Sequence, residues 1–462
     1  MFAARMLDRC VAAIAGVIGI VSFCPLQALA ESAPSAAAVE LNAELGQSVL
    51  PVGTSGKIYL RLSLKGLPIA TRKERPPVNV ALVLDRSGSM KGARIASAKA
   101  AANAALERLS ARDLVSVVAY NHEVDVLQPS APRGDGHALN GKIEKLTAEG
   151  RTALHAGVAS GATQVERNLD EMRVNRVILL SDGMANVGPS SPRELGELGR
   201  KLGAKGISVS TIGLGLDYNE DLMQRLAAAS DGNHAFVEDP EDLSTIFASE
   251  FGDALSITAK DIEIMIECRI GFKPVRVLGR EAQIEGNRIR LKLNQLQGAN
   301  ERYFIVELEQ PEVRTPGDAQ VASISVDYLD LSSGDRRQAE ATATARYSAS
   351  KEEADKSINK AVMSQVTTQV ATETSEHAVE LRDKGDISGA RKLLQGNAMY
   401  LKSARELYGV GADAASPATV KELRDLEKKQ NEAAANLDAQ SWDKTRKSMR
   451  YDQHKSKMQQ SY

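Results

Sequence analysis

The chain has 462 residues, of which 43% are hydrophobic and 26% are charged, and its formal net charge at pH 7 is −2. This length and composition are typical of a soluble protein with two to four domains. The near balance of acidic and basic residues argues against nucleic acid or an anionic membrane surface as a partner, because both attract strongly basic proteins.

The first thirty residues have the pattern of a secretory signal peptide. Arg5 and Arg9 precede the apolar run VAAIAGVIGIVSFC, and the small residues of ALA at 28–30 form a cleavage site. The apolar run is short for a transmembrane helix, so we expect cleavage after residue 30 and export to a periplasm or to the extracellular space. An uncleaved anchor is the alternative, and no later segment predicts a membrane span. Cleavage leaves Cys268 as the single cysteine, which excludes an internal disulfide.

Two segments before residue 77 predict β-strands. Residues 39–45 (VELNAEL) and 58–64 (IYLRLSL) alternate apolar and polar side chains, as half-buried strands do. A polar linker that contains Pro76 and Pro77 follows them. We therefore assign residues 31–77 to the N-terminal strands of a sheet and to this linker.

Residues 78–255 predict a domain in which strands alternate with helices. Strand segments such as NRVILLS at 175–181 are continuously apolar, which indicates a sheet covered on both faces. The alternation predicts the α/β class with a doubly wound, mostly parallel sheet, whose ligand site lies at the carboxyl ends of the strands. The expected strands are 79–85, 114–120, 124–128, 175–181, 207–213 and 233–238, and the expected helices are 91–110, 137–147, 153–170, 191–205, 219–230 and 241–255.

The rest of the chain predicts a β-sandwich followed by helices. Five segments within residues 256–348 alternate apolar and polar residues and are separated by Gly, Pro and Asn. The two earlier strands could join these five, so we expect one sandwich with the α/β domain inserted, rather than two unrelated sheets. Residues 349–436 have a helical periodicity and predict a helical hairpin or bundle. Residues 437–462 are polar and mildly basic around Trp442, and we expect this tail to be disordered.

Polar side chains lie at three points where predicted strands end. Asp85, Ser87 and Ser89 come at the end of a buried strand, and their alternate spacing can bring three oxygens to one point. Thr152 stands just before a predicted helix, and Asp182 comes directly after another buried strand. All three positions belong to the carboxyl edge of the predicted sheet, so the five oxygens can meet there. Oxygen ligands in a near-octahedral arrangement suit Mg²⁺, with Mn²⁺ or Ca²⁺ as alternatives.

These residues resemble the metal-ion-dependent adhesion site of the von Willebrand factor type A domain. The resemblance rests on DRSGS at the end of one strand, on Thr152 in a second loop and on SDG after a third strand, and it covers about residues 78–255. It implies that the three hydroxyl groups bind the cation directly and that the two aspartates bind it directly or through water. The order of the domains also resembles the inter-alpha-trypsin inhibitor heavy chains and bacterial relatives of calcium-activated chloride channel regulators.

The resemblance implies an exported adhesion or scaffold protein, not an enzyme. Hydroxyl ligands are neutral, so a bound cation keeps much of its charge, and a vacant coordination position can accept an Asp or Glu side chain of a protein partner. No catalytic residue is predicted, because no carboxylate–histidine pair is evident beside the five ligands.

Other interpretations stay open. The protein could be a Mg²⁺- or Mn²⁺-dependent hydrolase of phosphate or sulfate esters, because a catalytic metal also needs an open position. It could also be a structural module whose metal only stiffens the edge of the sheet. Without any metal, the serines and Thr152 could serve only as helix caps, and Asp182 could be a turn residue.

Overall fold

The computed structural model describes residues 37–68, 75–134, 137–411 and 413–459. The predicted signal peptide therefore lies outside the described residues. None of the described helices combines the length and the apolar character that crossing a membrane requires.

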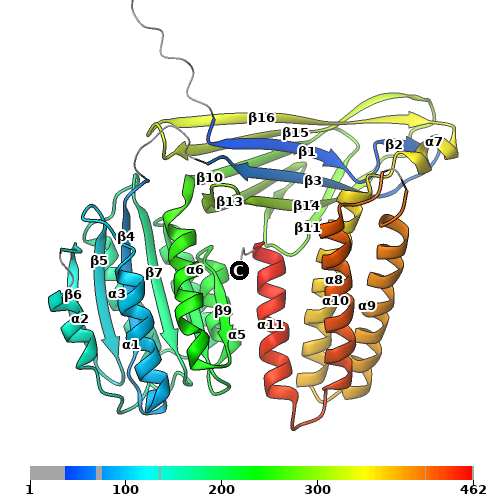
Figure 1. The fold of residues 1–462 in the computed structure, drawn as a ribbon. Helices are drawn as coiled ribbons and strands as arrows, with labels where there is room; N and C mark the ends of the chain where they lie inside the picture. The colour runs from blue at the N-terminus through cyan, green and yellow to red at the C-terminus, as the bar shows by residue number, and fades with distance from the viewer. Residues whose placement is uncertain (1–36, 69–74, 135–136, 412, 460–462) are drawn as a thin grey trace, which may run out of the picture. The chain divides into compact units, whose positions relative to one another are not determined.

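The α/β domain is built on a six-stranded sheet with the strand order β6-β5-β4-β7-β8-β9 (Figure 1). Neighbouring strands run parallel except β6, which is antiparallel to β5. Every residue of β4, β7 and β8 is buried, as a sheet covered on both faces requires. This sheet confirms the predicted fold class. Its strands are β4 (Val78–Asp85), β5 (Leu114–Tyr120), β6 (Val124–Pro132), β7 (Val174–Ser181), β8 (Ile207–Leu214) and β9 (His234–Val237).

Helices cover both faces of this sheet. Successive side chains of each strand point to opposite faces, so the residues that they contact show which helices lie on which face. On the central strand, Val80 and Leu82 pack in one hydrophobic cluster and Ala81 and Val83 in another. The first cluster holds α1 (Ala93–Leu106), α2 (His137–Glu144) and α6 (Leu243–Leu255) against the sheet. The second holds α3 (Leu154–Glu166), α4 (Pro192–Gly203) and α5 (Glu220–Ala229).

Two further sheets share a single hydrophobic core and form a sandwich. One has the strand order β1-β3-β14-β11 and the other has the order β12-β13-β10-β15-β16-β2. β3 precedes the α/β domain in the chain and pairs with β14, which follows it, so the α/β domain is inserted between strands of the sandwich. The strands are β1 (Val39–Leu45), β2 (Val49–Pro51), β3 (Gly56–Gly66), β10 (Ile257–Cys268), β11 (Lys273–Val277), β12 (Gln283–Glu285), β13 (Arg288–Gln297), β14 (Glu301–Gln310), β15 (Gly317–Asp330) and β16 (Arg336–Ser348).

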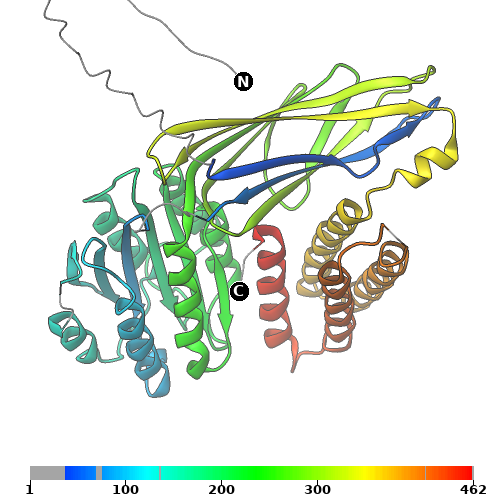
Figure 2. The ribbon, with the colours of Figure 1, turned by 45° about the horizontal axis from the view of Figure 1, so that its top comes forward.

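A short helix, α7 (Lys351–Lys356), leads from the sandwich into three long helices (Figure 2). These are α8 (Lys360–Asp383), α9 (Ile387–Tyr408) and α10 (Pro417–Ala435). α9 packs against both α8 and α10, so the three form a small bundle. Its interior contains Ala371, Leu401 and Leu423, one from each helix.

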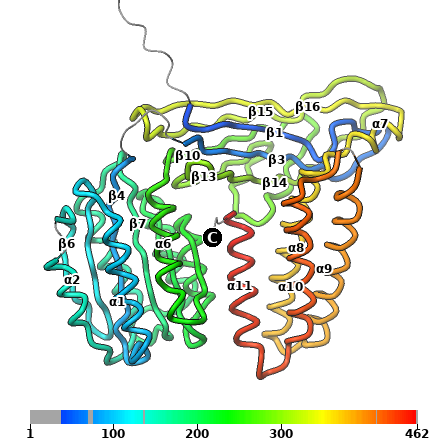
Figure 3. The backbone as a smooth tube through the Cα atoms, in the orientation of Figure 1, coloured from blue at the N-terminus to red at the C-terminus, as the bar shows by residue number. Residues whose placement is uncertain are grey.

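The end of the chain differs from the prediction. The tail that we expected to be disordered contains α11 (Trp442–Met458), which lies between the bundle and the α/β domain (Figure 3). Trp442, Met449 and Met458 are buried on this helix. Its basic side chains form ion pairs with carboxylates of α5 and α8, so α11 is stabilised by partners that composition alone does not reveal.

Candidate metal site

Asp85 ends β4 at the carboxyl edge of the α/β sheet, and both of its carboxylate oxygens accept hydrogen bonds. Oδ1 accepts from the main-chain N–H of Ser87 at 2.7 Å. Oδ2 accepts from the Ser181 hydroxyl at 2.6 Å and from the Tyr120 hydroxyl at 3.4 Å. The fully buried Asp85 thereby fixes the start of the loop that carries the two serines.

Three hydroxyl groups converge beside Gly183. The Ser87 and Ser89 hydroxyl oxygens are 3.0 Å apart, and Ser89 donates a hydrogen bond to Oδ1 of Asp182 at 2.6 Å. A Cβ atom at Gly183 would lie 2.9 Å from Oγ of Ser89, 3.5 Å from Oγ1 of Thr152 and 3.8 Å from Oγ of Ser87. Three hydroxyl oxygens therefore lie next to the space that the missing side chain leaves.

Main-chain hydrogen bonds join the loops that carry these side chains. Gly88 N–H donates to the Gly150 carbonyl oxygen at 3.0 Å. Thr152 N–H donates to the side chain of Asn186 at 2.9 Å, and the Asn186 N–H donates back to the Thr152 carbonyl oxygen at 3.1 Å. The structure therefore brings all five predicted residues to one edge, from three separate loops.

Burial sets the electrostatics of the two carboxylates. It raises the pKa of Asp85 to about 6, against the opposing effect of the hydrogen bonds from Ser181 and Ser87. It also raises the pKa of Asp182, against the opposing effect of Ser89 and Arg94. A nearby cation would stabilise the charged form of both groups. Five oxygen donors, of which three are neutral hydroxyls, fit a hard divalent cation such as Mg²⁺.

Arg94, which no sequence motif marks, lies on the rim of the site. Its Nη1 donates to Oδ2 of Asp182 at 2.7 Å, so one positive charge already contacts a proposed ligand. Arg94 is the second residue of α1 and belongs to no motif that the sequence displays. Only the placement of α1 next to the β7 loop reveals its role.

The described part of the chain has no group of three or more His, Cys, Asp or Glu side chains placed to hold a metal ion. The candidate site depends instead on Ser and Thr hydroxyls together with two carboxylates.

Comparison with known sequences identifies the inserted domain. Residues 79–249 match the von Willebrand factor type A domain. The chain is 28% identical over 270 residues to the protein sll0103 of Synechocystis sp., which covers 56% of this chain and 63% of the relative. It is 28% identical over 197 residues to the protein YfbK of Escherichia coli, covering 42% and 34%. It is 27% identical over 180 residues to the inter-alpha-trypsin inhibitor heavy chain H3 of Pongo abelii, covering 37% and 20%. The matches thus span less than two thirds of each relative.

Solved structures support the same fold beyond the inserted domain. A von Willebrand factor type A protein from Catenulispora acidiphila has a TM-score of 0.65 at 17% identity, and the match covers 83% of this chain and 89% of that one. The ArnB paralog VWA2 from Sulfolobus acidocaldarius has a TM-score of 0.58 at 15% identity, covering 87% and 98%. At these identities the likeness establishes the fold alone.

Proposed function

We propose that this protein, whose residues 79–249 form a von Willebrand factor type A domain, binds a divalent cation at the carboxyl edge of its sheet and uses it to bind a protein partner. Ser87, Ser89 and Thr152 would hold the cation directly, and Asp85 and Asp182 would hold it directly or through water. The observation that carries the proposal is the convergence of three hydroxyl oxygens on the space beside Gly183.

The bound cation would supply an open coordination position that attracts an Asp or Glu side chain of the partner. The chain's own residues prepare this position by their charge. Hydroxyl oxygens do not neutralise a cation, so the cation keeps charge that attracts an incoming carboxylate. Asp85 keeps the two serines in place through its hydrogen bond to the main chain of Ser87.

The arrangement favours binding over catalysis. Both oxygens of Asp85 accept hydrogen bonds, and both oxygens of Asp182 are engaged by Ser89 and Arg94. Carboxylates held in this way keep the serine hydroxyls and the main chain in fixed positions, as a preformed binding site requires. We therefore propose an adhesion or scaffold role, and the signal-like N-terminus supports a location in a periplasm or outside the cell.

Calorimetric titration with Mg²⁺, Mn²⁺ and Ca²⁺ tests the proposal. We expect the chain to bind one ion at this site and the variant Thr152→Val, which loses one hydroxyl ligand, to bind it at least about tenfold more weakly. Thr163→Val is the matched control, because Thr163 lies in α3, which begins just after Thr152, and its hydroxyl donates to the main chain of Ala159. Equal affinities of the wild type and Thr152→Val would overturn the proposed ligand set, and absence of binding would overturn the proposal as a whole.

A further inference from the structure

Arg94 connects the candidate metal site to a second carboxylate on the loop between β8 and α5. Its Nη1 donates to Oδ2 of Asp182 at 2.7 Å, and its Nη2 donates to Oδ2 of Asp217 at 3.2 Å. The Asp182 side chain is fully buried, whereas 67% of the Asp217 side chain is exposed. One guanidinium group therefore divides its charge between an inner and an outer carboxylate.

A divalent cation among the three hydroxyls would compete with Arg94 for Asp182. A cation bound at Asp182 would repel the guanidinium group, so we expect cation binding to weaken the contact between Arg94 and Asp182. Asp217 lowers the free energy of this exchange, because Arg94 keeps a carboxylate partner after it leaves Asp182. The position of Asp217 should therefore influence the affinity for the cation.

The loop that carries Asp217 is fixed by its neighbour Tyr218. The Tyr218 ring lies directly against Gly213 at the end of β8, where a Cβ atom would come within 2.2 Å of Cζ of the ring. Lys447 of α11 also contacts Tyr218. Its Nζ donates to the Tyr218 carbonyl oxygen at 2.8 Å and lies 4.7 Å from the centroid of the ring.

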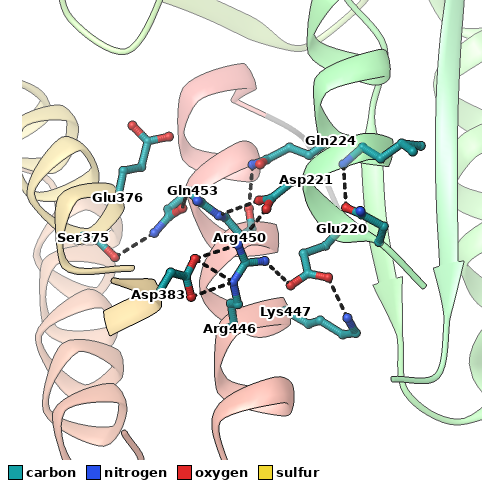
Figure 4. A network of polar contacts seen from close by, with 12 residues as sticks. Glu220, Asp221, Gln224, Ser375, Glu376, Asp383, Arg446, Lys447, Arg450 and Gln453 are labelled. Atoms are coloured by element: carbon teal, nitrogen blue, oxygen red, sulfur yellow. Dashed lines mark hydrogen bonds and ion pairs between the residues drawn. The ribbon is translucent and has the colours of Figure 1, made fainter. Parts of the chain in front are cut away.

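Helix α11 also forms ion pairs with the first turn of α5. Lys447 pairs with Glu220 at 2.6 Å, and both side chains are more than 90% buried. Arg446 pairs with Glu220, with Asp221 at 2.6 Å and with Asp383 of α8 at 2.8 Å (Figure 4). We call these five residues the α11 clamp: Glu220, Asp221, Asp383, Arg446 and Lys447.

We propose that α11 regulates the candidate metal site through the clamp, Asp217 and Arg94. When α11 is docked, the clamp fixes the β8–α5 loop and keeps Asp217 beside Arg94, which eases the release of Asp182 to a cation. Docking of α11 thus raises the affinity for the cation. Because coupling between two sites is reciprocal, the cation in turn strengthens the docking of α11. This regulation rests on the proposed function, since it acts on the same cation.

Two variants at opposite ends of this path test the coupling by calorimetric titration with Mg²⁺. Asp217→Asn removes the alternative partner of Arg94, and Lys447→Met removes the contact of α11 with Tyr218. Each should lower the affinity by about fivefold or more, the lower end of usual coupling factors. Asp217 is exposed, so its variant should fold normally. Lys457→Met is the matched control, because Lys457 lies on the same helix and pairs with Glu376 of α8.

The same two substitutions should also be measured in the variant Arg94→Gln. It removes the competitor for Asp182 and should raise the affinity for Mg²⁺. In this background, Asp217→Asn and Lys447→Met should no longer change the affinity, because both act through Arg94. Hydrogen exchange of α11 should also become slower when Mg²⁺ is added to the wild type.

The outcomes separate the two proposals. If the wild type binds Mg²⁺ but Asp217→Asn and Lys447→Met leave the affinity unchanged, the regulation is wrong and the metal site stands. If both variants weaken binding equally with and without Arg94, the path through Arg94 is wrong. If the wild type binds no divalent cation, the proposed function and the regulation fall together.

Discussion

The candidate metal site and the α11 clamp are both polar and buried, but they are built differently. In the metal site, each ligand lies within a few residues of the end of a buried strand or the start of a helix, and short hydrogen bonds such as Ser87 N–H to Asp85 shape the loop. In the clamp, Arg446 meets Glu220 across 226 positions of the chain. The first arrangement prepares a place for a ligand, whereas the second already holds its own counter-charges.

This difference has a physical consequence. Removing Glu220 from the clamp leaves the buried Lys447 without its carboxylate, so stability should fall. Removing an oxygen from the metal site, or filling its space, should chiefly weaken cation binding.

Glu220→Ala should destabilise the fold by about 3 kcal/mol, because it leaves the buried ammonium group of Lys447 without its carboxylate. Unfolding in urea, followed by circular dichroism, measures the change in the free energy of unfolding. Glu238→Ala is the control: its ion pair with Lys444 of the same helix is largely exposed and should contribute no more than about 1 kcal/mol. Equal losses for the two variants would contradict the distinction between a buried clamp and a surface pair.

Acid should weaken the contact between α11 and β9. His454 of α11 and His234 of β9 are buried, with 5.9 Å between their ring centroids. Burial lowers the pKa of His234 to about 3 and lowers the pKa of His454 well below its usual value. Nearby cationic side chains add to both effects, Lys447 for His234 and Arg302 and Arg280 for His454.

The direction of the pH effect depends on the pH at which the folded and the unfolded chain bind protons. The unfolded histidines take up protons near pH 6.5 and the folded ones do not, so this stability is complete above about pH 6.5 and declines below it. Near pH 5 the expected loss is about 2 kcal/mol for each histidine. Urea unfolding near pH 7.5 and near pH 5 should show a smaller difference for His454→Gln than for the wild type. Comparing the two proteins cancels the opposite contribution of Asp85, whose pKa is raised. If His454→Gln and the wild type lose the same stability between the two pH values, His454 does not cause the pH dependence.

Gly183→Ala should weaken the binding of Mg²⁺ by about tenfold or more, equivalent to about 1.4 kcal/mol, with little change in the free energy of unfolding. The added Cβ atom would occupy the space among the three hydroxyls. Calorimetric titration and urea unfolding measure the two quantities. Gly252→Ala, where the added atom meets nothing within 4 Å, is the control. A Gly183→Ala variant that is much less stable but binds Mg²⁺ normally would show that Gly183 serves the fold and not the cation.

Ser191→Ala should have a smaller effect, a loss of about 1 kcal/mol. Ser191 begins α4 with a capping box, in which its hydroxyl oxygen accepts from Glu194 N–H and the Glu194 carboxylate accepts from Ser191 N–H. This interaction spans three residues, so it provides a local standard against which the long-range clamp can be compared. Thermal unfolding of Ser191→Ala beside the control Ser190→Ala measures the loss of stability. A loss as large as that of Glu220→Ala would show that the local cap and the long-range clamp contribute equally.

The contrast also explains what the sequence could predict. Asp85, Ser87 and Ser89 can be recognised in the sequence because they alternate within a few residues at the end of an apolar strand. The insertion of the α/β domain follows from alternation on both sides of it, and the pairing of β3 with β14 agrees with that expectation. Each of these features is encoded by neighbouring residues.

The remaining features depend on the fold as a whole. Arg94 and Asp217 belong to different segments, and no pattern relates them to Asp182. The polar composition of α11 predicts disorder, because a basic segment without partners remains solvated. Arg446 and Lys447 become ordered only because the fold presents Glu220, Asp221 and Asp383 to them.

The most direct test of the central claim is X-ray diffraction from crystals of the chain grown with Mn²⁺, measured for its anomalous signal. We expect one strong anomalous peak among the hydroxyl oxygens of Ser87, Ser89 and Thr152, close to Asp182. A well-ordered loop at this edge without such a peak, or a peak bound by other residues, would contradict this claim.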